Sequence, residues 1–94
     1  MITIYKYSFE TEDRFELTMP AGSKILTVDT QGDSPAMWVL ADTEAESQVT
    51  RRFAVFRTGG VSHREDIRKM TFIGTYLTLS GREVYHVFEV INGE

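Results

Sequence analysis

The stretch Arg14-Phe15-Glu16-Leu17-Thr18-Met19 alternates polar and apolar residues one by one. Successive side chains of a β-strand point to opposite faces of the sheet, so this period of two places the three apolar residues on one face. The same kind of pattern begins at residues 2–7 and closes the chain at residues 84–90, and little of the sequence follows the period of a helix. The chain is therefore predicted to be all-β.

The same alternation along the rest of the chain predicts about seven antiparallel strands in a small sandwich or an open barrel. At most one short helix is expected near residues 62–69, where Ser62 and Glu65 have the spacing of a capping box. The first two strands are expected to pair as a hairpin, and the last two as another. The strands are predicted at residues 2–9, 14–19, 24–30, 36–41, 48–58, 71–79 and 84–91.

Prolines and the single tryptophan add detail to this scheme. Residues 20–23 and 31–35 are expected to be turns, because both segments combine Pro with Gly. Residues 36–41 are apolar at both phases of the period, which predicts a central strand covered on both sides. Trp38 is accordingly expected in the core.

Size and composition limit the classes of protein to which the chain can belong. At 94 residues it is expected to form a single domain over residues 1–94. The absence of Cys excludes disulfides and thiolate metal sites. No apolar run approaches the roughly 20 residues that span a bilayer, and no secretory signal is visible. These features favour a soluble protein of a reducing cytoplasm that does not enter a membrane.

The net charge of −4 comes from 14 acidic and 10 basic residues. Nucleic-acid binding is not expected, because affinity for a phosphate backbone depends on Lys and Arg contacts. One acidic cluster covers residues 10–16 and another covers residues 42–46. Most charged clusters are solvated surface, but an acidic cluster also steers association with a basic protein.

A break in the alternation follows the predicted fifth strand. In Arg57-Thr58-Gly59-Gly60, consecutive glycines allow backbone amides to turn inward, and Arg57 and Thr58 can complete an anion pocket. His63 and Arg64 follow closely and join this candidate site. The alternative is that the glycines simply end the strand with an unusual φ. No metal site and no cofactor are expected, because His63 and His86 lie in different predicted elements.

A series of short motifs runs along the chain: Ile4-Tyr5-Lys6-Tyr7, Pro20-Ala21-Gly22, Ile25-Leu26-Thr27-Val28, Pro35-Ala36-Met37-Trp38, Asp42, Arg52-Phe53, Thr58-Gly59, Ile73-Gly74-Thr75 and Tyr85-His86-Val87-Phe88-Glu89. In this order, the motifs resemble a family of small uncharacterised proteins encoded by phages and prophages. The resemblance covers nearly the whole sequence but does not include residues 64–69. It implies a phage origin, a β-rich fold and a location in the cytoplasm of the bacterial host, and it brings no activity or catalytic residues.

The leading functional hypothesis is a non-enzymatic binding protein that inhibits a host defence component by protein–protein contact. No nucleophile elbow, P-loop or dinucleotide motif occurs in the sequence. One alternative is a module that sequesters a small phosphorylated or nucleotide ligand at Arg57–Gly60, and another is a virion or assembly component. A homodimer is expected in each case, because the first and last strands are apolar on both faces.

Overall fold

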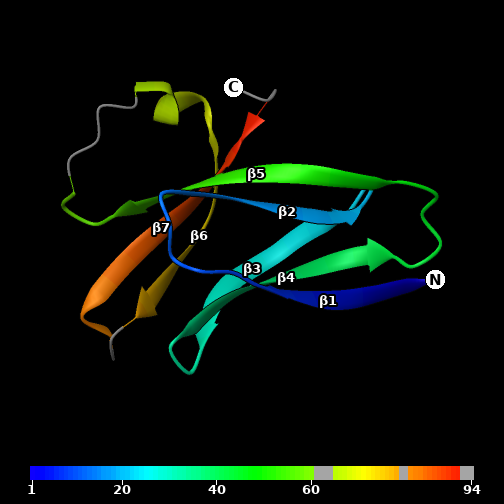
Figure 1. The fold of residues 1–94 in the computed structure, drawn as a ribbon, viewed down its shortest axis with the longest axis horizontal. Coiled ribbons are helices and arrows are strands. Elements are labelled where there is room, and N and C mark those ends of the chain that lie inside the picture. Colours follow the sequence, from blue (N-terminus) through cyan, green and yellow to red (C-terminus); the bar gives the residue numbers. More distant parts are fainter. Residues whose placement is uncertain (61–64, 79–80, 92–94) are drawn as a thin grey trace.

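The computed structural model describes residues 1–60, 65–78 and 81–91, which form seven antiparallel strands and one short 3₁₀ helix (Figure 1). The all-β class, the strand number and the single short helix confirm the predictions. Residues 61–64, which include Ser62 of the predicted capping box, lie outside the described part. The elements are β1 (Ile2–Ser8), β2 (Arg14–Pro20), β3 (Lys24–Gln31), β4 (Ser34–Asp42), β5 (Gln48–Arg57), η1 (Glu65–Lys69), β6 (Thr71–Thr78) and β7 (Glu83–Val90).

The strands form two sheets, which pack as a small sandwich. One sheet has the order β1-β4-β3 and the other has the order β2-β5-β7-β6. The sheets approach one another along β3 and β6, where a Cβ placed on Gly74 would lie 3.5 Å from the Cβ of Val28. A Cβ at position 74 would therefore make only an ordinary van der Waals contact with Val28, where β3 and β6 lie beside one another.

The prediction that the first two strands form a hairpin is wrong, whereas the prediction of a final hairpin is confirmed by the pairing of β6 with β7. β1 pairs with β4, and β2 pairs with β5. The connection at residues 9–13 crosses from one sheet to the other, because it lacks the Gly or Asn that a tight hairpin turn needs. Phe9 instead enters the core and stacks on Phe15 at a centroid distance of 4.3 Å.

The core lies between the inner faces of the two sheets. Phe15, Leu17 and Met19 all contact it, as the alternation of residues 14–19 predicts, although only Met19 is fully buried. Every strand except β1 contributes at least one buried residue, so neither sheet is stable without the other. The buried core cluster contains Phe9, Met19, Val28, Met37, Val39, Phe53, Val55, Tyr76 and Val87.

β4 is central in its sheet, as predicted, but it is not covered on both sides. Met37 and Val39 are fully buried on the inner face, whereas Trp38 and Leu40 are only partly buried on the outer face. The prediction that Trp38 belongs to the core is therefore wrong. A strand that is apolar on both faces does not by itself reveal whether another layer of the protein covers its outer face.

Pro20 is the last residue of β2 and does not lie in the following turn as predicted. It lies on an edge strand, where a missing N–H removes no bond from the ladder. Pro35 lies within β4, beyond the turn that Gly32 forms with a φ of 67°. Both prolines therefore extend strands by one or two residues beyond the predicted bounds.

One charged pair lies at the inner face of the four-stranded sheet. The Nε and Nη2 atoms of Arg51 donate to the two carboxylate oxygens of Glu89 at 2.7 and 2.8 Å. Nη1 of Arg51 also donates to the backbone oxygen of Ser23 at 2.8 Å. The hydrogen bond to Glu89 raises the pKa of Arg51. This fork-to-fork arrangement links β5 to β7 and to the turn after β2.

Candidate functional site

The residues of the predicted anion pocket form a tight turn at the end of β5. The amide of Gly60 donates to the carbonyl of Arg57 at 3.0 Å, and the amide of Thr58 donates to the carbonyl of Val84 at 3.0 Å. Gly59 has a φ of 77°, which places it in the left-handed region. Two of the amides that an anion would need are therefore already bonded, and the need for glycine comes from the turn.

The turn supports the alternative in which the glycines end the strand. His63 and Arg64 lie outside the described residues, so a phosphate pocket that includes them remains a prediction. Arg57 has its Nη1 atom 3.6 Å from a carboxylate oxygen of Glu83 and is largely exposed. An anion at this position would compete with that carboxylate for the guanidinium.

Thr58 contributes its hydroxyl to a group on the outer face of the four-stranded sheet. The Oγ1 atom of Thr58 is 2.6 Å from Nε2 of His86, and Oγ1 of Thr75 is 2.9 Å from Nδ1. Both ring nitrogens of His86 are therefore hydrogen-bonded to threonine hydroxyls. The sequence did not reveal this group, because Thr58 and Thr75 become neighbours of His86 only through strand pairing.

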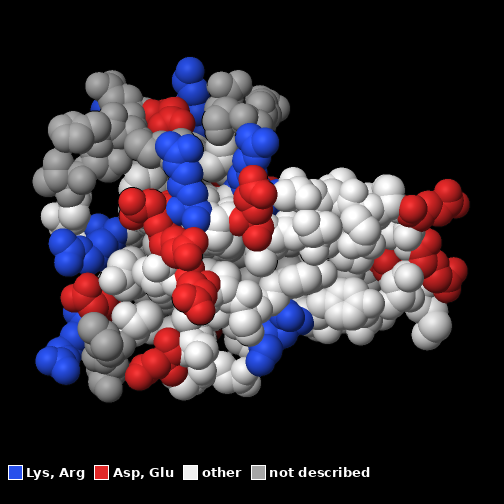
Figure 2. Space-filling view, in the orientation of Figure 1, with Lys and Arg blue, Asp and Glu red and all other residues white. Residues whose placement is uncertain are grey.

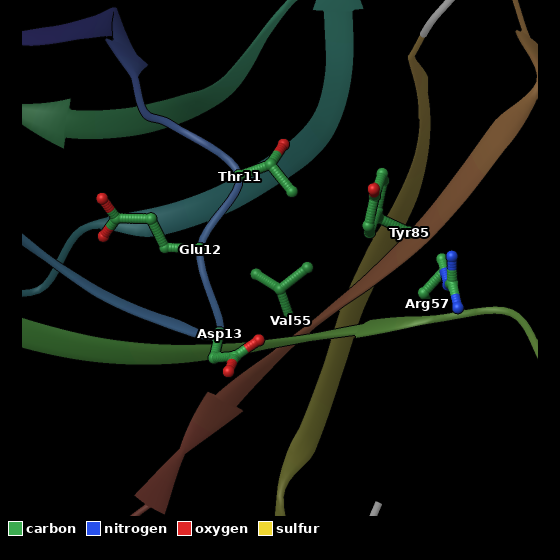
Figure 3. Close-up of a pocket in the computed structure, with 6 residues that line it drawn as sticks. All are labelled: Thr11, Glu12, Asp13, Val55, Arg57 and Tyr85. Carbon is green, nitrogen blue, oxygen red and sulfur yellow. The ribbon is translucent and has the colours of Figure 1, made fainter. Parts of the chain in front are cut away.

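A pocket of about 340 Å³ lies where the β1–β2 connection faces β5 and β7 (Figure 3). In the close-up, the connection lies on one side, Arg57 and Tyr85 lie on the other, and Val55 lies between them. The carboxylate of Glu12 points away from Arg57. The pocket is lined by Thr11, Glu12, Asp13, Val55, Arg57 and Tyr85.

Negative charge predominates around this pocket. Among the described residues that line the pocket, Arg57 is the only cation, whereas Glu12 and Asp13 contribute carboxylates. Glu83 also pairs with Arg57. The Tyr85 hydroxyl donates to a carboxylate oxygen of Glu83 at 3.2 Å. Burial, with a smaller contribution from Glu83, raises the pKa of Tyr85. The phenol therefore stays protonated near neutral pH, and the balance of charge favours a cationic group over a phosphate.

The acidic connection at residues 9–13 is attached to both sheets. The amide of Phe9 donates to the Pro35 carbonyl at 3.2 Å, and the amide of Val55 donates to the Asp13 carbonyl at 3.0 Å. Between these two points, the hydroxyls of Thr11 and Tyr76 are joined by a hydrogen bond of 2.8 Å. Acidic side chains gather over this connection in the space-filling view (Figure 2).

The backbone bonds hold the connection in place while its acidic side chains remain in water. Residues 10–13 are all exposed, so their carboxylates can meet a partner without rearrangement. The sequence predicted the acidic cluster but not the pocket. Arg57 and Tyr85 come together only because they are opposite one another in β5 and β7.

The comparison with known families covers the whole chain. The model of a domain of unknown function, DUF7352, matches residues 1–94. The chain belongs to the DUF7352 family. No curated protein matches this DUF7352 domain, and no solved structure matches it.

Within residues 1–60, 65–78 and 81–91, no group of three or more His, Asp or Glu side chains is placed to hold a metal ion. The described helix is too short and too polar to cross a membrane.

Proposed function

We propose that this DUF7352 domain is a non-enzymatic protein-binding module that docks its acidic β1–β2 connection onto a basic surface of a partner protein. The observation that carries the proposal is the anchoring of residues 9–13 to both sheets, with Glu10, Glu12 and Asp13 left exposed. Such a surface loses little conformational freedom on binding.

Charge supports the choice of a basic partner. The connection carries three carboxylates within four residues, and the domain as a whole has a net charge of −4. Complementary charge accelerates encounter and suppresses wrong partners. The pocket beside the connection has room for the end of a Lys or Arg side chain, which would lie near Asp13 and Tyr85.

The proposed partner is a host protein in the cytoplasm of an infected bacterium, where the domain inhibits a defence component. This part of the proposal rests on the resemblance to phage-encoded proteins. It also rests on the small size of the chain and on the lack of a known catalytic motif in its sequence. We also propose that the module acts as a homodimer. Its support is the exposure of apolar side chains on β1, where Ile2 and Ile4 keep more than half of their surface in water.

The test is affinity capture from a bacterial lysate with three forms of the domain. The wild type is compared with Glu10→Gln/Glu12→Gln and with the control Glu44→Gln/Glu46→Gln, which removes the same charge from another exposed loop. A specific partner should bind the wild type and the control alike. Its affinity for the first double variant should fall about fivefold, because rim charge pairs contribute roughly 0.2–1 kcal/mol each.

Two results would count against the proposal. Capture of no host protein would remove its basis, and equal loss in both double variants would show that only total charge matters. If a partner is captured, the domain should protect an infecting phage from the defence to which that partner belongs. Absence of any benefit to the phage would refute the counter-defence role but not the binding surface.

A further inference from the structure

The outer edge of β1 carries backbone groups that the sandwich does not use. Residues opposite one another in an antiparallel pair alternate between bonded and non-bonded positions. Thr43 donates to the Met1 carbonyl at 2.8 Å and Phe9 donates to the Pro35 carbonyl at 3.2 Å, so the odd-numbered residues of β1 bond to β4. The N–H and C=O groups of Ile2, Ile4, Lys6 and Ser8 therefore point away from the sheet.

No described residue of the chain pairs with this edge. β1 ends its three-stranded sheet, and it forms the lower border of the right half of Figure 1 with no strand below it. An unpaired strand of seven residues is a template for addition of another strand. Natural proteins usually block such an edge with charge, proline or a bulge.

The other sheet edges differ from β1 in this respect. In β2, bonds from Val55 to Asp13 and from Ala21 to Ser47 show that the odd-numbered residues face β5. Its free edge therefore belongs to Arg14, Glu16, Thr18 and Pro20, which include two charges and a residue without an N–H. The edges of β3 and β6 lie beside one another at Val28 and Gly74.

The side chains of β1 do not block its edge. Ile2 and Ile4 are 64% and 55% exposed, and Tyr5 is 40% exposed. Lys6 is the only charged residue of β1, and its Nζ donates to Oε1 of Gln31 at 2.6 Å. Because Gln31 ends β3 on the far side of β4, this ammonium extends across the sheet and not outward from the edge.

We infer that β1 pairs with β1 of a second copy, antiparallel, around a two-fold axis beside Tyr5. With full overlap, Ile2 lies opposite the partner subunit's Ser8, and Ile4 lies opposite the partner subunit's Lys6. All of these are residues whose backbone groups point outward, so the pairing forms about eight hydrogen bonds. A strand shifted by an odd number of residues would not match donors with acceptors.

A second copy fits this edge better than an unrelated strand for two reasons. A two-fold interface needs the same surface on both chains to be complementary to itself, which the even-numbered residues of β1 satisfy. The same pairing places Tyr5 beside the partner subunit's Tyr5 and covers exposed apolar surface on both copies. This inference rests on the proposed self-association and is independent of the host partner.

The first test uses the absence of cysteine from the chain. Tyr5 occupies a non-hydrogen-bonded position at the axis, so its two Cα atoms would be about 4.5 Å apart, within the range of a disulfide. The two Cα atoms of Ile4 would be about 9 Å apart, which is too far. Tyr5→Cys should therefore form a disulfide-linked dimer under mild oxidation, and the matched control Ile4→Cys should not.

The second test measures mass and affinity. Light scattering of the wild type at micromolar concentration should give twice the 10.7 kDa of one chain. Ile4→Lys would place a new ammonium opposite the partner subunit's Lys6 at two symmetric positions, so the dissociation constant of the dimer should rise about tenfold. Circular dichroism establishes that the variant, changed at an exposed position, keeps its strands.

Each outcome decides the inference. A monomeric wild type would overturn self-association through β1 while leaving the host-binding proposal intact. A dimer that cross-links through Ile4→Cys as well as through Tyr5→Cys would overturn the register. A dimer that neither cysteine links, or whose affinity Ile4→Lys leaves unchanged, would place the interface elsewhere on the domain.

Discussion

Replacing Glu89 by Gln should destabilise the domain, because the carboxylate accepts two hydrogen bonds from Arg51 in a partly buried position. The bonds measure 2.7 and 2.8 Å, and the two side chains are only 24% and 14% exposed. Gln has nearly the same volume as Glu, so packing is retained. The variant loses the negative charge and one of the two acceptors, while Arg51 stays charged in the same place.

The size of the effect follows from the degree of burial. Removal of one partner from a fully buried ion pair costs about 3–5 kcal/mol, whereas an exposed pair contributes at most about 1 kcal/mol. The Arg51–Glu89 pair lies between these limits, and one amide oxygen of Gln can still accept from the guanidinium. We expect Glu89→Gln to lower the free energy of unfolding by about 2 kcal/mol.

A second ion pair of the same sheet provides the control. Arg52 and Glu16 approach to 3.5 Å, and their side chains are 51% and 60% exposed. Glu16→Gln should therefore change the free energy of unfolding by less than about 0.5 kcal/mol. Urea unfolding followed by tryptophan fluorescence measures both variants. Equal effects of the two substitutions would refute the link between burial and the strength of the Arg51–Glu89 pair.

Two further predictions concern a buried tyrosine and the turn after β5. Burial is the largest influence on the Tyr76 hydroxyl and raises its pKa above the ordinary value of 10.0. The protonated Tyr76 therefore contributes its full stabilisation below about pH 10, and this stabilisation is lost as the pH rises through the pKa of the folded state. Tyr76→Phe should therefore make the free energy of unfolding less dependent on pH in this alkaline range. Urea unfolding at several pH values measures this dependence, and the same dependence in the variant and the wild type would contradict this reasoning. Gly59→Ala should cost about 1 kcal/mol because φ is 77°, and Gly59→Asn should cost less because Asn tolerates the left-handed region; equal melting temperatures for the two variants would contradict this explanation.

The candidate site could be predicted only in part. The sequence identified the acidic connection and Arg57, because a cluster of like charges and a glycine break are local features. It associated Arg57 with an anion, but strand pairing brings Glu83 to its guanidinium and Tyr85 to its side. The linkage of Thr11 to Tyr76 spans 65 residues and has no local signal at all.

The alternation of residue types established that the chain is all-β and, in the uninterrupted strand β2, which side chains share the core face. Phe15, Leu17 and Met19 contact the core as their spacing requires, because alternation of side chains is a property of a single strand. The three-dimensional structure was needed to show that β1 pairs with β4 and not β2, that Trp38 lies on an outer face, and that no described residue pairs with the outer edge of β1. These outcomes depend on which strands pair and bury one another's apolar surface. The strands that compete for each partner lie far apart in the chain, so no local pattern of residues reveals which of them pair.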